Sequence, residues 1–178
     1  MALLLSFSRL IDRLNCSIGH FTRWLVLGSV LLSALSATLR YMLDWGSNAM
    51  IEGQWFMFGL IFLFYAPLTL QERGHVRVDI LYNRLSPRAQ VLVEMLGALL
   101  FLLPVSLLIV INAWDYFLIA FHQNEASVNP GGLIWWPMKL AIPLGFGLLA
   151  LQGVAELIKG AAALTGHLPL PQATNGAH

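Results

Sequence analysis

The side chains that could do chemistry in this chain are few, and their spacing favours no common catalytic or metal site. His122 and Glu125 are spaced like a metal-binding pair, but no third ligand lies near them, so coincidence explains them better. Cys16 is the only cysteine, which excludes an intrachain disulfide and a cysteine-based metal site. We therefore predict no catalytic residue, no bound metal and no cofactor.

Haem is the cofactor of the main alternative, in which the chain is the membrane anchor of a redox complex. Such an anchor binds haem through paired histidines within its membrane spans. The five histidines instead fall at segment ends, in loops or in the tail: His20, His75, His122, His167 and His178. A Soret band in the optical spectrum of the purified protein would revive this alternative.

Acidic residues that could pass an ion through a membrane are confined to the ends of apolar segments. Glu52, Glu94 and Glu156 all occupy such positions. A transporter core needs polar or ionisable groups near the midplane, or broken helices that expose carbonyl groups. The polar candidates within the third span, Ser106 and Asn112, are interpreted as hydrogen-bonding residues between helices. The chain therefore lacks an obvious ion pathway of its own.

Four long apolar segments must position these groups. Of the 178 residues 58% are hydrophobic and only 11% are charged, whereas a soluble domain carries roughly 25% charged residues. The pattern predicts an all-α membrane protein, with one domain over residues 1–165 and transmembrane helices over about 21–43, 50–72, 87–118 and 138–162. Residues 166–178 are predicted to be a disordered tail. A net charge of +1 and the lack of a basic stripe argue against a nucleic-acid partner.

Basic residues predict how the four spans are oriented. An even number of spans places both ends on one side of the membrane. That side holds eight of the ten Lys and Arg residues: Arg9, Arg13, Arg23, Arg73, Arg77, Arg84, Arg88 and Lys159. Only Arg40 and Lys139 lie on the other side. Because positive charge is retained in the cytoplasm, both termini and the middle loop are predicted to be cytoplasmic.

Two further helices are predicted to lie along the membrane surface. Over residues 1–18 the apolar side chains recur at helical spacing, with Arg9, Asp12 and Arg13 opposite, which indicates an amphipathic helix on the inner leaflet. Residues 78–85 show the same pattern and predict a short in-plane helix. The Ser86-Pro87 pair then predicts an N-cap and first-turn proline that open the third span.

Small residues and prolines mark special positions within the spans. Ser29, Ser33 and Ala37 line one face of the first span, and Gly145 and Gly153 share a face of the fourth. Such faces let helices approach closely, either inside a tight bundle or at a docking surface for a partner. Two prolines inside spans, at positions 67 and 104, are expected to bend their helices.

Tryptophans concentrate at the predicted outer ends of the spans, at positions 45, 55, 114, 135 and 136. Tryptophan favours the headgroup level, where its ring is buried and its N–H stays hydrated. The residues therefore indicate an interfacial belt, and Trp135 and Trp136 are also candidates for an aromatic surface that contacts a partner.

The middle loop carries the most specific motif. Gly74-His75-Val76-Arg77-Val78-Asp79, directly after a span, resembles the signature of the small permease subunit of tripartite ATP-independent periplasmic (TRAP) transporters. Other segments fit in order: Leu39-Arg40-Tyr41, Glu52-x-Gln54-Trp55, Glu125-x-Ser127-x-Asn129-x-Gly131-Gly132, Trp136-Pro137-x-Lys139 and Leu151-Gln152-Gly153. The last three resemble a subgroup associated with mannitol-type, chloroaromatic or other organic-acid substrates.

This resemblance implies a non-catalytic scaffold in the bacterial inner membrane. Its expected partners are membrane lipids, a large permease subunit that carries the sodium and substrate sites, and a periplasmic substrate-binding protein. The assembly would import a small organic anion with sodium. The candidate residues for anchoring and subunit contact are Glu52, Gln54 and Trp55 at the outer boundary, and Arg73, His75, Arg77 and Asp79 at the inner one.

Overall fold

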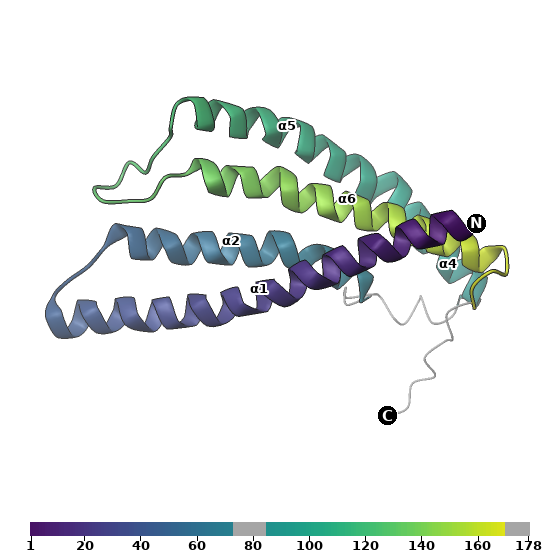
Figure 1. Cartoon of the computed structure of the whole chain (residues 1–178), viewed down its shortest axis with the longest axis horizontal. Helices are drawn as coiled ribbons and strands as arrows, with labels where there is room; N and C mark the ends of the chain where they lie inside the picture. Colours follow the sequence, from purple (N-terminus) through teal and green to yellow (C-terminus); the bar gives the residue numbers. More distant parts are fainter. Residues whose placement is uncertain (73–84, 170–178) are drawn as a thin grey trace.

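The computed structural model describes residues 1–72 and 85–169, which form helices joined by short connections (Figure 1). The helices are α1 (Ala2–Leu43), α2 (Asn48–Gln71), α4 (Pro87–Gly97), the π-helical turn η1 (Ala98–Leu102), α5 (Leu103–His122) and α6 (Trp136–Leu164). Since α4, η1 and α5 are continuous, the described residues contain four helical rods that are long and apolar enough to cross a membrane. The prediction of an all-α protein with four spans is confirmed.

Helix α6 is the centre of the bundle. It packs against α1, α2, α4 and α5, whereas α5 packs mainly against α6 (Figure 1). The connections 44–47 and 123–135 lie together at what we name the loop end. The N-terminus and the last turns of α6 lie at the opposite end, named the termini end. The two ends hold the polar clusters described below.

Helix α1 differs from the expected surface helix followed by a separate span. It is one helix of 42 residues, about 63 Å long at 1.5 Å per residue and twice the ~30 Å hydrocarbon core. It contains no proline, and it runs through Gly19 without interruption. Glycine leaves space there for Leu68, with which a side chain at this position would collide. Residues 2–18 therefore lie in the first half of α1. The expected in-plane helix falls mainly on residues 78–84, outside the described part, as does most of the predicted tail.

The face of α1 that meets α6 is the more polar one. Ser8, Ile11 and Asn15 are buried, and Ser8 donates a hydrogen bond to the carbonyl oxygen of Ala155 at 3.5 Å. The long apolar side chains in the first half of α1, for example Leu3, stay exposed. Polar groups thus join α1 to its neighbour, and apolar groups face outward.

The small-residue faces are used for packing inside the chain. Gly145 of α6 lies against Leu63 of α2, and Gly153 lies against Leu102. On α1, the Oγ of Ser33 donates a 2.8 Å hydrogen bond to Oε1 of Gln54. Of the two alternatives left open by the sequence, the structure shows the tight internal bundle at these positions.

Replacing Gly145 by alanine is expected to destabilise the protein by about 2 kcal/mol through overpacking. A Cβ at this position would lie 2.8 Å from Cβ of Leu63 and 3.1 Å from its carbonyl oxygen, so the two helices would have to separate. Gly147→Ala is the matched control, because a Cβ there meets nothing within 4 Å and alanine favours the helix. Thermal unfolding in detergent measures both, and equal melting temperatures would contradict the prediction.

The third rod is irregular where proline was expected to disturb it. A proline ring clashes with the carbonyl group four residues earlier in a regular α-helix. The π-helical turn η1 ends at Leu102, two residues before Pro104, and widens the backbone there. At Pro67, by contrast, α2 continues without interruption to Gln71. The Oγ of Ser86 caps α4 by accepting a hydrogen bond from the Ala89 N–H, which confirms the predicted N-cap.

Candidate functional site

A buried carboxylate organises the loop end. Glu52 lies in the first turns of α2 and is only 1% exposed. It accepts hydrogen bonds from the Oγ of Ser127, from Nδ2 of Asn129 (2.9 Å) and from the backbone N–H of Leu133 (2.7 Å). A carboxylate buried near a membrane is tolerated when its oxygens accept several such bonds. Glu52 therefore joins α2 to a loop about 75 residues away.

The loop is shaped to surround that carboxylate. Asn124 and Gly131 have positive φ angles of 47° and 70°, a region that favours glycine and tolerates asparagine. Gly132 leaves the necessary space, because a Cβ there would collide with Ser127 and lie 2.8 Å from Oε2 of Glu52. Gly131 is thus needed for its backbone conformation, and Gly132 is needed because it leaves space for the neighbouring side chains.

Backbone contacts complete this arrangement. The N–H of Ser127 donates to the carbonyl oxygen of Leu133 at 2.9 Å, and Nδ2 of Asn48 donates to the carbonyl oxygen of Pro130 at 3.0 Å. Most helix connections in bundles are short, and longer loops with built structure are often functional. The loop at residues 123–135 therefore has a defined conformation.

The chemistry around Glu52 is that of a structural carboxylate. All three partners donate hydrogen to it, whereas a cation site needs oxygen atoms that converge as acceptors. The arrangement can hold a loop in place without holding an ion.

An ion pair at the loop end also joins the loop to α6. Lys139 is buried and forms an ion pair with Glu125, and its ammonium lies 3.8 Å from the ring centroid of Tyr116. The ring supplies a cation–π contact in a poorly solvated place. Glu125 is thus engaged by lysine, and His122 packs against Phe121.

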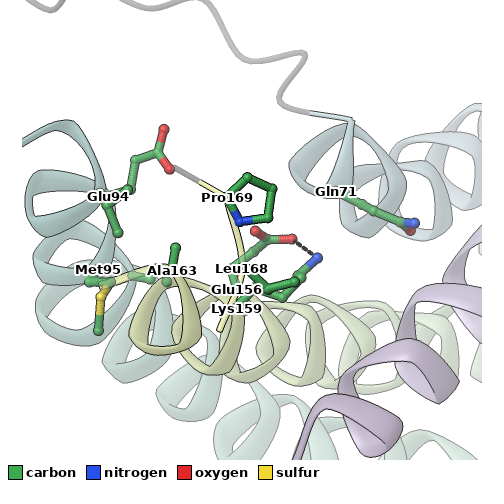
Figure 2. Close-up of a pocket in the computed structure, with 11 residues that line it drawn as sticks. Gln71, Glu94, Met95, Glu156, Lys159, Ala163, Leu168 and Pro169 are labelled. Carbon is green, nitrogen blue, oxygen red and sulfur yellow. Dashed lines mark hydrogen bonds and ion pairs between the residues drawn. The ribbon is translucent and has the colours of Figure 1, made fainter. Parts of the chain in front are cut away.

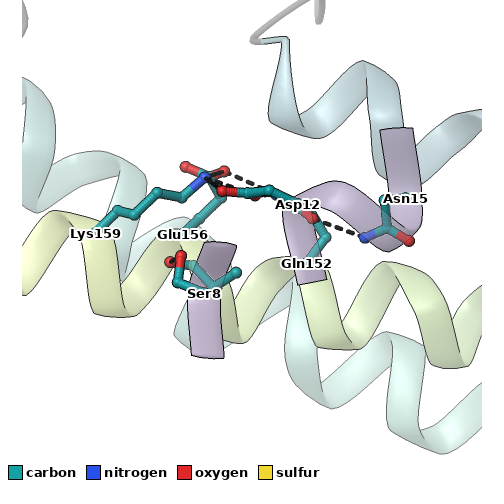
Figure 3. A network of polar contacts seen from close by, with 7 residues as sticks. Ser8, Asp12, Asn15, Gln152, Glu156 and Lys159 are labelled. Carbon is teal, nitrogen blue, oxygen red and sulfur yellow. Dashed lines mark hydrogen bonds and ion pairs between the residues drawn. The ribbon is translucent and has the colours of Figure 1, made fainter. Parts of the chain in front are cut away.

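A polar network at the termini end joins α1 to α6 (Figure 3). Gln152, 0% exposed, accepts a 2.7 Å hydrogen bond from Asn15 and donates to Asp12 (2.9 Å) and Glu156 (3.0 Å). Lys159 forms ion pairs with Asp12 at 3.1 Å and with Glu156 at 2.5 Å. The network places one ammonium between two carboxylates and ties both to a buried amide.

Of the predicted site residues at the loop end, some are buried in the protein and others are exposed on its surface. Glu52 is enclosed by its own chain, and its role in anchoring or subunit contact stays a prediction. Gln54 bonds to α1, as described, and Trp55 is 62% exposed. Trp135 makes an edge contact with Phe56, and Trp136 makes edge and tilted contacts with two phenylalanines of α5. Trp55 is the outward-facing member of the set.

The predicted inner residues lie outside the described part of the chain: Arg73, His75, Arg77 and Asp79. Their roles in anchoring or subunit contact stay predictions.

Several polar residues of the two clusters were not among the predicted site residues. Ser127 and Asn129 are part of the sequence motif that resembles the TRAP subgroup. Gln152 could have been found because it is an amide within a run of residues without charge. Asn112, interpreted as a hydrogen-bonding residue between helices, donates instead to the Leu108 carbonyl oxygen of its own helix at 2.7 Å. Its side chain is exposed, and no helix in the described part of the chain covers it.

Four apolar helices with polar clusters at both ends define a multi-pass helical membrane protein. The family model "Tripartite ATP-independent periplasmic transporters, DctQ component" matches residues 29–163. The chain therefore belongs to this family and is the small membrane subunit of a TRAP transporter in the inner membrane. The resemblance to the family is thus confirmed, and the resemblance to the mannitol-type or chloroaromatic subgroup stays a prediction. A search of curated proteins and a search of solved structures each found no match.

Proposed function

We propose that this subunit is a non-catalytic scaffold for a large permease subunit that imports a small organic anion together with sodium. A periplasmic protein captures the substrate, and the permease subunit carries the substrate and sodium sites. The present chain enlarges the rigid part of the membrane complex against which the transporting domain moves.

The observation that carries this proposal is the distribution of charge along the helices. Residues 24–39, 53–71, 95–114 and 140–155 contain no Asp, Glu, Lys, Arg or His. The acids and lysines discussed above lie at the two ends, where they bond to the chain itself. Coupled ion transport uses polar groups near the midplane, so the ion pathway is expected in the partner.

Outward apolar faces of α1 and α5 are the proposed contact surfaces for the large subunit. The small-residue faces are used internally, so the remaining surfaces are those with long exposed side chains. On α1 these include Trp24 and Leu31, and on α5 they include Leu108 and Ile111. Helices associate in lipid through close packing of such faces.

The proposal predicts that transport depends on this chain although the chain cannot transport alone. The complete system in proteoliposomes should show sodium-driven uptake, and omission of this subunit should abolish it. The lone chain should show none, and the chain should co-purify with the large subunit in mild detergent. Sodium-driven uptake by the lone chain, or full uptake without it, would overturn the scaffold role.

Both termini are proposed to be cytoplasmic, because eight of the ten Lys and Arg residues fall in the sequence on the side of the spans that holds the termini. A fluorescent protein fused after His178 should fluoresce, and alkaline phosphatase fused after Gly46 should be active. These results test the orientation because the first reporter matures in the cytoplasm and the second needs the periplasm. The reverse pattern would show that the loop end faces the cytoplasm.

A further inference from the structure

Helix α1 carries a row of basic side chains along its exposed surface. Arg9, Arg13 and Arg23 lie within about 80° of one another around the helix axis at 3.6 residues per turn. All three are exposed, and no residue in the described ranges 1–72 and 85–169 forms an ion pair with them. We name these three residues the basic row.

The acidic residue of the same segment is turned away from the basic row. Asp12 forms an ion pair with Lys159 at 3.1 Å, and Lys159 is also paired with Glu156 in the cavity drawn in Figure 2. These charges therefore neutralise one another between α1 and α6. Residues 73–84, outside the described part of the chain, contain three arginines and one aspartate, so they bring at most one carboxylate to the basic row.

The first half of α1 has three faces, which lie about 120° apart at 3.6 residues per turn. One face is buried: Ser8, Ile11, Asn15, Gly19 and Thr22. The second is the basic row. The third consists of long apolar side chains that stay exposed: Leu3, Phe7, Leu10, Leu14 and Phe21. An exposed apolar face beside a basic face is typical of a helix at the membrane boundary, where the apolar side chains enter the acyl region and the basic ones meet the headgroups.

The contacts of α1 place its first half at that boundary. From Ser8 to Asn15 the helix advances about 10 Å, whereas their partners Ala155 and Gln152 are only about 5 Å apart along α6. Helix α1 therefore crosses α6 obliquely (Figure 1). The crossing lies where the charge-free residues 140–155 of α6 end, so the N-terminal part of the basic row lies near the level of the lipid phosphates.

We propose that the basic row binds anionic phospholipids, with Arg9 and Arg13 on the phosphates of the leaflet at the termini end. Guanidinium groups form bidentate, charge-assisted hydrogen bonds with phosphate, and each basic side chain near an anionic membrane surface strengthens binding. A zwitterionic lipid binds less well because its headgroup brings a cation of its own. This inference depends on the membrane location of the helices and is independent of the proposed scaffold role.

The test uses the full chain in nanodiscs made from equal amounts of phosphatidylglycerol and phosphatidylcholine with the same acyl chains, followed by mild detergent and native mass spectrometry. We expect the wild-type chain to retain the anionic lipid with a preference of about tenfold. If these arginines only fixed the orientation of the chain during insertion, the purified chain would show no headgroup preference. Equal retention of both lipids, or retention of neither, would overturn the proposal.

Arg13→Gln should lower this preference to about threefold, and the double variant with Arg9→Gln should bring it close to equal retention. Both side chains are exposed, so the variants should fold with the wild-type melting temperature. Arg40→Gln is the matched control, because Arg40 is an exposed basic residue of the same helix at the loop end. An unchanged preference in the double variant, or an equal loss in Arg40→Gln and Arg13→Gln, would overturn the site.

A photo-crosslinking residue at position 17 distinguishes lipid from a protein partner. Ser17 is exposed and lies one helical turn after Arg13, beside the basic row. In the native membrane, with the complete transporter present, this residue should label phospholipid. Crosslinking to a protein instead would show that a partner chain covers the basic row, and it would overturn the proposal.

Discussion

Replacing Glu52 by alanine is expected to lower the free energy of unfolding by about 3 kcal/mol. The change leaves three donors without their acceptor: the hydroxyl of Ser127, the amide of Asn129 and the N–H of Leu133. The loss corresponds to a melting temperature lower by about 6–12 °C for a chain of this size. Thermal unfolding in detergent measures it, and limited proteolysis should show cleavage within residues 123–135.

Two variants at the same loop serve as controls. Asn48→Ala removes one exposed hydrogen bond to Pro130, so it should lower stability by about 1 kcal/mol or less. Glu52→Gln keeps one acceptor oxygen but brings an amide donor towards other donors, and its effect should be intermediate. If Glu52→Ala were no less stable than Asn48→Ala, the carboxylate would not organise the loop.

Replacing Gln152 by leucine is expected to destabilise the contact between α1 and α6 by about 2 kcal/mol. Leucine fills a similar volume and suits the apolar surroundings, so the effect comes from the polar partners left behind. Asn15 loses its acceptor, and Asp12 and Glu156 each lose a donor. The first half of α1 should therefore separate more often from α6.

The rate of maleimide labelling at Cys16 measures this separation without an introduced probe. Cys16 is the free thiol next to Asn15 and is partly buried, so opening of the contact should raise its labelling rate several-fold. Asn112→Leu is the control, because that amide bonds within its own helix. Labelling of Gln152→Leu at the rate of the control would show that the network does not hold α1 in place.

The four spans could be predicted because bilayer thickness requires long apolar helices, whatever their arrangement. The charge-free runs and the N-cap at Ser86 are local properties of the chain, and so is the position of the irregularity before Pro104. The family could also be recognised from short ordered motifs. Each of these conclusions depends only on residues that are close in the sequence and on the lipid that surrounds the helices.

The continuity of α1 shows where local patterns were insufficient. Over residues 1–18 the apolar side chains recur at helical spacing, with polar ones opposite, as they would in a helix lying on a surface. The structure shows that the polar side of this helix meets α6, through Asn15 and Asp12. A periodic pattern identifies a polar face, but water and a polar neighbouring helix satisfy that face equally well.

The pairing of distant polar groups came from the assembled bundle alone. Glu52 meets Ser127 across 75 residues, and Asn15 meets Gln152 across 137. The lengths of the apolar segments and the positions of the charges determine how deep in the membrane each residue lies. Which side chains then meet depends on how each helix is rotated and on how closely small residues such as Gly145 let the helices approach. These are properties of packing between segments, and hydrogen bonds act only over the short distances that this packing creates.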